Sequence, residues 1–159
     1  MGNDKSTHEY MKRHYIIQPA TKNDLPAMTF ILQSLHYPWH PSALETCFHE
    51  NYLAWIIKHR TIVAGFLIVK TTASHWEIIL IAIAPAFQRQ GLATKLLQFL
   101  QETTKSLQLD VRKSNHIAIL LYKKCGFVQV GIRKEYYTDG KKKEDALLFD
   151  WIKAKPAAQ

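Results

Sequence analysis

The stretch from Glu77 to Leu100 constrains the fold of this chain more than any other. Residues 77–84 form a nearly unbroken apolar run, which predicts a strand buried on both faces. Pro85 ends this run. After a short basic loop, leucines recur at the spacing of an amphipathic helix, at Leu92, Leu96, Leu97 and Leu100. The chain is therefore expected to pass from a buried strand into a helix through one glycine-containing loop.

The loop before this helix has the composition of a phosphate-binding site. The first turn of a helix carries unpaired N–H groups and the positive end of the helix dipole, so its backbone can bind phosphate oxygens. Gly91 would let the chain approach a ligand closely, and Arg89 adds positive charge. A single glycine, taken alone, is more typical of an ordinary strand-to-helix turn. The loop matches neither a G-x-G-x-x-G dinucleotide motif nor a P-loop.

Length and composition limit the remaining possibilities. The 159 residues suffice for one domain with a sizeable core, and no apolar run reaches the roughly 18 residues of a membrane span. We therefore expect a cytoplasmic protein that does not bind membranes. A formal net charge of +8 favours an acidic partner such as a nucleotide polyphosphate, RNA or a ribonucleoprotein surface. Cys47 and Cys125 are isolated, which predicts neither a disulfide nor a zinc site.

Periodicity and turn residues predict an α/β (α+β) chain of the order β-α-α-β-β-β-α-β-α-β-β. The expected strands are 14–19, 52–58, 61–70, 77–84, 106–111, 128–132 and 146–152, and the expected helices are 25–35, 42–48, 92–100 and 116–124. The spacing from Ser42 to Glu45 is that of a capping box, which predicts the start of the second helix. Residues 1–13 are expected to be a disordered tail, 14–153 one domain, and 154–159 a C-terminal tail.

Three motifs in sequence order resemble one enzyme family. Residues 88–93, Gln-Arg-Gln-Gly-Leu-Ala, resemble the Q/R-x-x-G-x-G/A signature of the Gcn5-related N-acetyltransferases (GNAT), which wraps the pyrophosphate of acetyl-CoA. Residues 109–127 are similar to the L-E-V-R-x-S-N-x-x-A-I-x-L-Y-x-x-x-G-F run of the ribosomal-protein-alanine N-acetyltransferases (RimI-like) within that superfamily. Residues 132–146 are similar to its terminal I-R-x-x-Y-Y segment. With Pro38 and Trp39, the resemblance covers residues 14–152.

The resemblance implies a fold and a cosubstrate. The fold would be a single-domain acyl-CoA N-acyltransferase with a mixed central sheet that splays between its fourth and fifth strands. Acetyl-CoA would lie in the gap, with its pantetheine arm bonded to strand backbone, and no metal is implied. The residues that the resemblance assigns to acetyl-CoA are Ile81, Ala82, Ile83, Arg89, Gln90, Gly91, Leu92, Ala93, Thr94 and Asn115. Asn115 could also serve only as a helix cap, or do both.

Acetyl transfer to an amine requires two proton transfers. An α-amine has a pKa near ~8 and a lysine near ~10.4, so a base must take one proton before the amine can attack. The departing thiolate leaves faster if a phenol of pKa ~10 protonates it. The resemblance assigns the base to Asp110 and the acid to Tyr122. The other interpretation of Tyr122 is a packed helix residue with its hydroxyl at the surface.

Asp110 departs from the family, which usually has glutamate at this position. Aspartate is one methylene shorter, so a water-relayed proton path becomes an alternative to direct contact. Glu77 is the reserve candidate for the base, although a solvated strand end is the simpler interpretation of its position.

The acceptor is the least constrained part of the prediction. The resemblance places Trp39, Tyr136, Tyr137 and Glu77 at the entrance for the acceptor, with the α-amine of a protein that begins with alanine, possibly ribosomal, as substrate. A lysine or a small amine is the alternative acceptor. A module that binds CoA or RNA without turnover is the alternative of another class. Direct nucleic-acid readout is not expected because the aromatic residues fall in the predicted core or cleft, and the oligomeric state stays open.

Overall fold

The computed structural model describes residues 14–155. The expected tail over residues 1–13 and residues 156–159 of the expected C-terminal tail lie outside the described residues. Between residues 14 and 155, no helix is both long and apolar enough to cross a bilayer.

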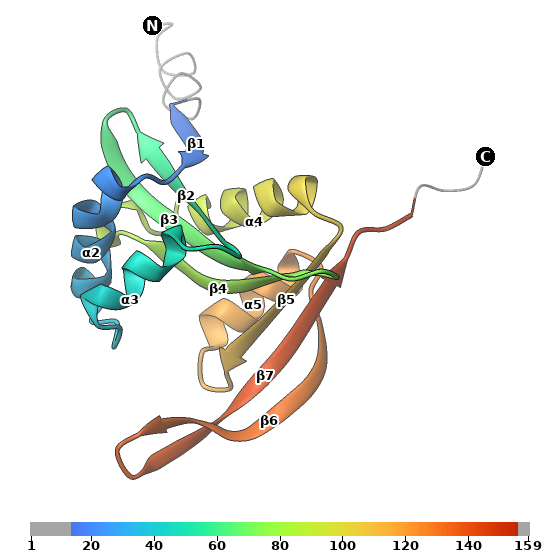
Figure 1. Cartoon of the computed structure of the whole chain (residues 1–159). Coiled ribbons are helices and arrows are strands. Elements are labelled where there is room, and N and C mark those ends of the chain that lie inside the picture. The colour runs from blue at the N-terminus through green and yellow to red at the C-terminus, as the bar shows by residue number, and fades with distance from the viewer. Residues whose placement is uncertain (1–13, 156–159) are drawn as a thin grey trace, which may run out of the picture. The chain divides into compact units, whose positions relative to one another are not determined.

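Within the described residues, the strands form a seven-stranded sheet of order β1-β2-β3-β4-β5-β7-β6 (Figure 1). β4 and β5 are parallel, and their pairing runs from Trp76 with Leu107 to Ile78 with Leu109. β4 then continues to Ile83, so the two strands splay apart as the resemblance predicted. The strands are β1 (Tyr15–Pro19), β2 (Tyr52–His59), β3 (Ile62–Thr71), β4 (Trp76–Ile83), β5 (Ser106–Arg112), β6 (Val128–Asp139) and β7 (Lys142–Ile152).

The helices follow the predicted order with one corrected start. They are α2 (Leu25–Ser34), α3 (Pro41–Glu45), α4 (Leu92–Thr103) and α5 (His116–Lys124), with 3₁₀ turns η1 (Lys22–Asp24), η2 (Thr46–Phe48) and η3 (Pro85–Phe87). The capping box at Ser42 was wrong, because α3 begins one residue earlier. His40 caps α3 instead, since its Nδ1 accepts the Ser42 N–H at 3.3 Å.

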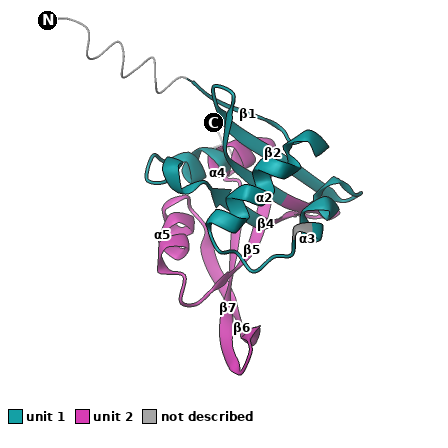
Figure 2. Ribbon diagram, turned by 90° about the vertical axis from the view of Figure 1, so that its left-hand side faces the viewer, with its two compact units in different colours: residues 1–68, 80–96 teal, residues 69–79, 97–159 magenta. Residues whose placement is uncertain are grey.

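The chain divides into two compact units (Figure 2). Unit 1 comprises residues up to 68 together with 80–96, and unit 2 comprises 69–79 together with residues from 97 onward. The fully buried side chains of unit 1 include Met28, Leu44, Ile56, Phe66, Leu92 and Leu96, and those of unit 2 include Leu97, Leu100, Leu107 and Phe149. The predicted leucine stripe of α4 is therefore confirmed as core.

Strand β4 is buried on one face only. Ile78, Leu80 and Ala82 are buried, whereas the residues that alternate with them are half-buried. The prediction of a strand buried on both faces was therefore wrong in this respect. The isoleucines of the half-buried face made the sequence look uniformly apolar.

The last two strands are longer than predicted. β6 and β7 pair from Val128 with Asp150 to Asp139 with Lys142, whereas the predicted strands ended at Ile132 and began again only at Ala146. The register shifts between Arg133 and Tyr137, which marks a bulge in β6. This bulge and the charged residues around it interrupt the apolar alternation, so the sequence concealed the pairing.

Candidate active site

The loop between β4 and α4 has the geometry of an anion site. Arg89 and Gly91 both adopt left-handed backbone conformations, with φ of 63° and 76°. The first bond of α4 runs from the Lys95 N–H to the Gly91 carbonyl at 3.1 Å. The N–H groups of the first helical turn, residues 91–94, therefore have no acceptor within the helix and are available to a ligand.

Exposed side chains of this loop precede a buried residue at the start of α4. Arg89 and Gln90 are exposed, whereas Leu92 is 1% exposed, so only its backbone can serve a ligand. A Cβ built on Gly91 meets no atom within 4 Å, so the positive φ, not crowding within the protein, requires glycine here. The loop fits a pyrophosphate, because it offers backbone donors, a nearby guanidinium and open space.

Strand β1 anchors this loop, a contact that the sequence did not predict. The Tyr15 hydroxyl donates to the Gln90 side-chain oxygen at 2.5 Å, and the Lys95 ammonium lies 5.1 Å from the centre of the Tyr15 ring. Ala93 and Thr94, two of the residues assigned to acetyl-CoA, are half-buried on the same helical turn.

The backbone of β4 presents alternate residues to its two edges. The Ala82 carbonyl faces β3, since a Cβ on Gly65 would lie 2.7 Å from it. The Ala84 N–H likewise donates to the Ala64 carbonyl of β3 at 2.8 Å. Backbone groups alternate along a strand, so Ile81 and Ile83 direct theirs to the other edge. The Ile83 carbonyl accepts the Gln88 side-chain N–H at 3.1 Å.

A cleft of about 370 Å³ in unit 2 brings the two candidate bases together, because Asp110 and Glu77 both line it. Glu77 pairs with Gln108 across β4 and β5, and Gln108 pairs with Asp150 across β5 and β7. Asp110 lies two residues beyond Gln108, so its side chain points to the same face of the sheet. Adjacent strands lie ~4.8 Å apart and a strand rises ~3.3 Å per residue, so the backbone positions of Glu77 and Asp110 lie roughly 8 Å apart.

Three charged or titratable residues of this cleft were not predicted. Asp150, Arg133 and His75 line it together with the apolar Leu148 and Val130. The alternation of Asp150 with the buried Phe149 could have placed Asp150 on the open face of the sheet. Arg133 belongs to a motif that carried the resemblance, but it was given no role there.

Tyr122 lies on α5, against the other face of the unit 2 sheet. Its ring centre is 5.6 Å from that of Phe127 and 6.5 Å from that of Phe149, and both phenylalanines are buried. Phe149 alternates with Leu148 along β7, and Leu148 lines the cleft. The candidate acid and the candidate base therefore lie on opposite faces of the same sheet.

Asn115 caps α5, as the sequence predicted. Its side-chain oxygen accepts the Ala118 N–H at 3.2 Å, which leaves the amide NH₂ group as a possible donor to a ligand. Gly126, with φ of 88°, terminates the same helix.

The aromatic residues assigned to the acceptor fall into two groups. Tyr136 and Tyr137 follow each other on β6 with ring centres 5.2 Å apart, edge to face, and Tyr136 is 51% exposed. Trp39 lies in unit 1 between α2 and α3, where its ring centre is 6.0 Å from that of Tyr37. In the part of the chain that the structure describes, no group of three or more His, Cys, Asp or Glu side chains could hold a metal ion.

Comparisons with known proteins indicate one enzyme family. A model of the acetyltransferase (GNAT) family matches residues 20–127. The ribosomal protein bS18-alanine N-acetyltransferase of Escherichia coli strain K12 is 35% identical over 140 residues, which cover 83% of this chain and 93% of that protein. The protein of the same name from Haemophilus ducreyi is 32% identical over 141 residues, which cover 84% and 97%.

One solved structure has the same fold as this chain over most of its length. The crystal structure of the ribosomal-protein-S18-alanine N-acetyltransferase from Escherichia coli aligns with a TM-score of 0.81 at 30% identity. The alignment covers 90% of this chain and 96% of the crystallised chain.

Proposed function

Because the chain belongs to the acetyltransferase (GNAT) family, we propose that it transfers acetyl from acetyl-CoA directly to the N-terminal α-amine of a ribosomal protein that begins with alanine. The family match and the Escherichia coli structure confirm the predicted resemblance and fold, and with them an N-acetyltransferase enzyme. The acceptor named for the relatives, ribosomal protein bS18, supports the proposed substrate. We take residues 14–153 as the acetyltransferase domain, acting in the cytoplasm.

The first part of the proposal assigns acetyl-CoA to this chain's residues. The amides of residues 91–94 and the Arg89 guanidinium would hold the pyrophosphate, because both carry positive charge toward an open space. The backbones of Ile81 and Ile83 would hold the pantetheine arm, with a further contact from Asn115. The alternation of β4 favours these two isoleucines over Ala82. When bound, acetyl-CoA supplies the acetyl group as a thioester.

The cleft around Asp110 is the single observation that carries the proposed reaction. An α-ammonium entering it would meet carboxylates on β4, β5 and β7. Asp110 takes the proton that the amine must lose, either directly or through one water. Glu77 lines the same cleft and would take part in a water-relayed path, which would compensate for the shorter reach of an aspartate at this position.

Tyr122 would supply the second proton transfer. Its ring is held by Phe127 and Phe149, so the hydroxyl has a defined position at the α5 face. The hydroxyl protonates the departing thiolate as the amide bond forms. The acceptor would enter from the cleft face and the thioester from the α5 face, so that proton removal and proton donation occur on opposite sides of the reacting carbonyl.

Aromatic and polar residues near the acceptor complete the proposal. Tyr136 and Tyr137 on β6 and Trp39 before α3 would contact the first residues of the peptide. Carboxylates such as Glu77 would hold its protonated amine by charge-assisted hydrogen bonds before transfer.

Mass spectrometry of two matched peptides tests the proposed acceptor. One peptide begins with a free alanine, and the other has a blocked N-terminus and one internal lysine; each is incubated with the protein and acetyl-CoA. We expect an acetyl-sized mass gain on the alanine peptide alone. Gain only on the lysine peptide would instead identify a side-chain acceptor. Gain on neither, with a melting temperature that rises on adding acetyl-CoA, would mean that the acceptor is another amine.

A further inference from the structure

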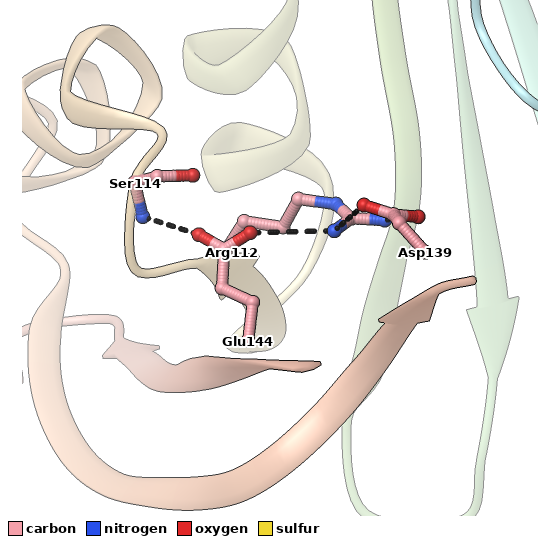
Figure 3. Close-up of polar contacts among 4 residues, drawn as sticks. All are labelled: Arg112, Ser114, Asp139 and Glu144. Carbon is pink, nitrogen blue, oxygen red and sulfur yellow. Dashed lines mark hydrogen bonds and ion pairs between the residues drawn. The ribbon is translucent and has the colours of Figure 1, made fainter. Parts of the chain in front are cut away.

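An ion-pair cluster closes the end of β5 (Figure 3). We call Arg112, Asp139 and Glu144 the Arg112 cluster. The two terminal nitrogens of Arg112 contact the two carboxylate oxygens of Asp139 at 3.0 and 3.3 Å, and one of them also contacts Glu144 at 3.3 Å. This places one guanidinium from β5 between two carboxylates of the β6–β7 hairpin. Two-pronged pairing of this kind is more rigid than a single contact.

Glu144 extends the cluster to the turn that leads into α5. Its second carboxylate oxygen accepts the Ser114 N–H at 2.7 Å (Figure 3). On the same turn, the Lys113 N–H donates to the Asp145 carbonyl at 3.1 Å. Contacts from Ser114 and then Arg112 hold the pKa of Glu144 below its usual value, so the carboxylate stays charged. The next residue is Asn115, which caps α5. One side chain thus ties the hairpin to the turn that positions Asn115.

The same arginine also holds an aromatic residue of the hairpin. The Arg112 guanidinium lies 4.3 Å from the centre of the Tyr137 ring, and that ring contacts Tyr136 edge to face. Tyr136 lies in the β6 bulge and Tyr137 follows it, paired with Glu144 of β7. Asp145 closes this bulge, because its carboxylate accepts the Glu135 N–H at 2.9 Å. Two adjacent residues of β7 therefore hold two different segments: Glu144 holds the turn before α5, and Asp145 holds the bulge of β6.

We propose that Arg112 and Glu144 are positioning residues that link the acceptor side of the site to its cofactor side. Ordering of the 113–115 turn by bound cofactor would, through Glu144 and Arg112, also order the hairpin that carries Tyr136 and Tyr137. The inference rests on the proposed function, which assigns Asn115 to the cofactor and the tyrosines to the acceptor. Partial burial supports the link, because the Arg112 and Glu144 side chains are only 31% and 27% exposed.

Hydrogen exchange measured with and without CoA tests the link without any acceptor. In the wild type, CoA should slow hydrogen exchange in residues 88–95, and this slowing reports cofactor binding. CoA should also slow exchange at least about threefold in residues 133–145, and this slowing reports the link. In Arg112→Met and Glu144→Gln, CoA should still protect residues 88–95 but no longer residues 133–145. Lys143→Met is the matched control, because it breaks the exposed 3.6 Å pair with Glu135 on the same hairpin and should keep both effects.

A kinetic comparison separates positioning from simple loss of stability. Both variants should raise the KM for the acceptor about tenfold or more while the Kd of acetyl-CoA stays within about twofold, and Arg112→Lys should recover part of the loss. Hairpin protection that survives in Arg112→Met and Glu144→Gln would overturn the link while leaving the proposed function intact. Absence of CoA protection at residues 88–95 in the wild type would instead overturn the proposed cofactor site, and the link with it.

Discussion

Gly65 offers a direct test of how tightly β3 and β4 are joined beside the proposed cofactor site. In Gly65→Ala, the new Cβ would lie 2.7 Å from the Ala82 carbonyl oxygen, 2.6 Å from Cδ1 of Ile83 and 3.3 Å from its Cα. The isoleucine methyl can rotate away, but the carbonyl belongs to a strand in the sheet and cannot move alone. The strands must therefore separate by several tenths of an ångström.

The cost of this overpacking follows from its location. Forcing one extra methyl group into packed structure costs about 1–3 kcal/mol, and a backbone contact places Gly65→Ala toward the upper end. For a chain of this size each kcal/mol lowers the melting temperature by roughly 2–4 °C, so the expected fall is roughly 5–10 °C. The displaced β4 backbone should also weaken acetyl-CoA binding, because Ile81 and Ile83 are proposed to hold the pantetheine arm.

Thermal unfolding followed by circular dichroism, with and without acetyl-CoA, measures both effects. The matched control is Gly140→Ala at the β6–β7 turn, where a Cβ meets nothing within 4 Å. Its φ of 63° leaves only the left-handed strain of about 1–2 kcal/mol, and acetyl-CoA should raise its melting temperature as much as that of the wild type. A Gly65→Ala protein that melts within about 2 °C of the wild type would refute the reasoning.

Four further predictions concern the two proposed reacting groups, the Glu144 carboxylate and one buried thiol. Tyr122→Phe keeps the ring contacts and should lower turnover at least about 100-fold while acetyl-CoA affinity, measured by calorimetry, stays the same; unchanged turnover would remove Tyr122 as the acid. Asp110→Asn should reduce turnover most at low pH. The difference from the wild type should shrink as the pH passes the α-amine pKa near ~8, because the free amine needs no base. A difference that does not change with pH would assign proton removal to Glu77 or water. The folded protein lowers the pKa of Glu144 from its ordinary value of 4.5, so the charged carboxylate stabilises the fold above pH 4.5 and this stability is lost as the pH falls through the lower, folded pKa. On acidification, the melting temperature of Glu144→Gln should therefore fall less than that of the wild type. An equal fall in the variant and the wild type would contradict this. Burial raises the pKa of Cys47 to about 11, so its alkylation by iodoacetamide at pH 8 should be much slower than in the unfolded chain, and equal rates would show that the thiol is accessible.

Local rules were sufficient to predict the elements that are proposed to hold the cofactor. The leucine stripe predicts α4, Pro85 and Gly91 mark the loop before it, and Asn115 and Gly126 mark the two ends of α5. Each of these signals acts over a few residues, through helical spacing, capping or a positive φ. The structure therefore reproduces them where the sequence placed them.

The cleft proposed for the acceptor could not be predicted from the sequence, because it depends on the tertiary structure. Asp110 and Glu77 could be proposed separately from the sequence, but Asp150 joins them only because β7 lies between β5 and β6 in the sheet. Strand order and register depend on pairing between distant segments, which alternation within one strand does not encode.

The sequence by itself determined the order of elements, the candidate phosphate-binding loop and the identity of the candidate acid and base. Only the tertiary structure decided which carboxylates share the cleft, that Tyr122 lies on the opposite face, and that Glu144 joins the hairpin to both Arg112 and the α5 turn. The physical reason is range: capping and periodicity act between neighbours in the chain, whereas these contacts join residues that are brought together by sheet pairing and by the bulge in β6.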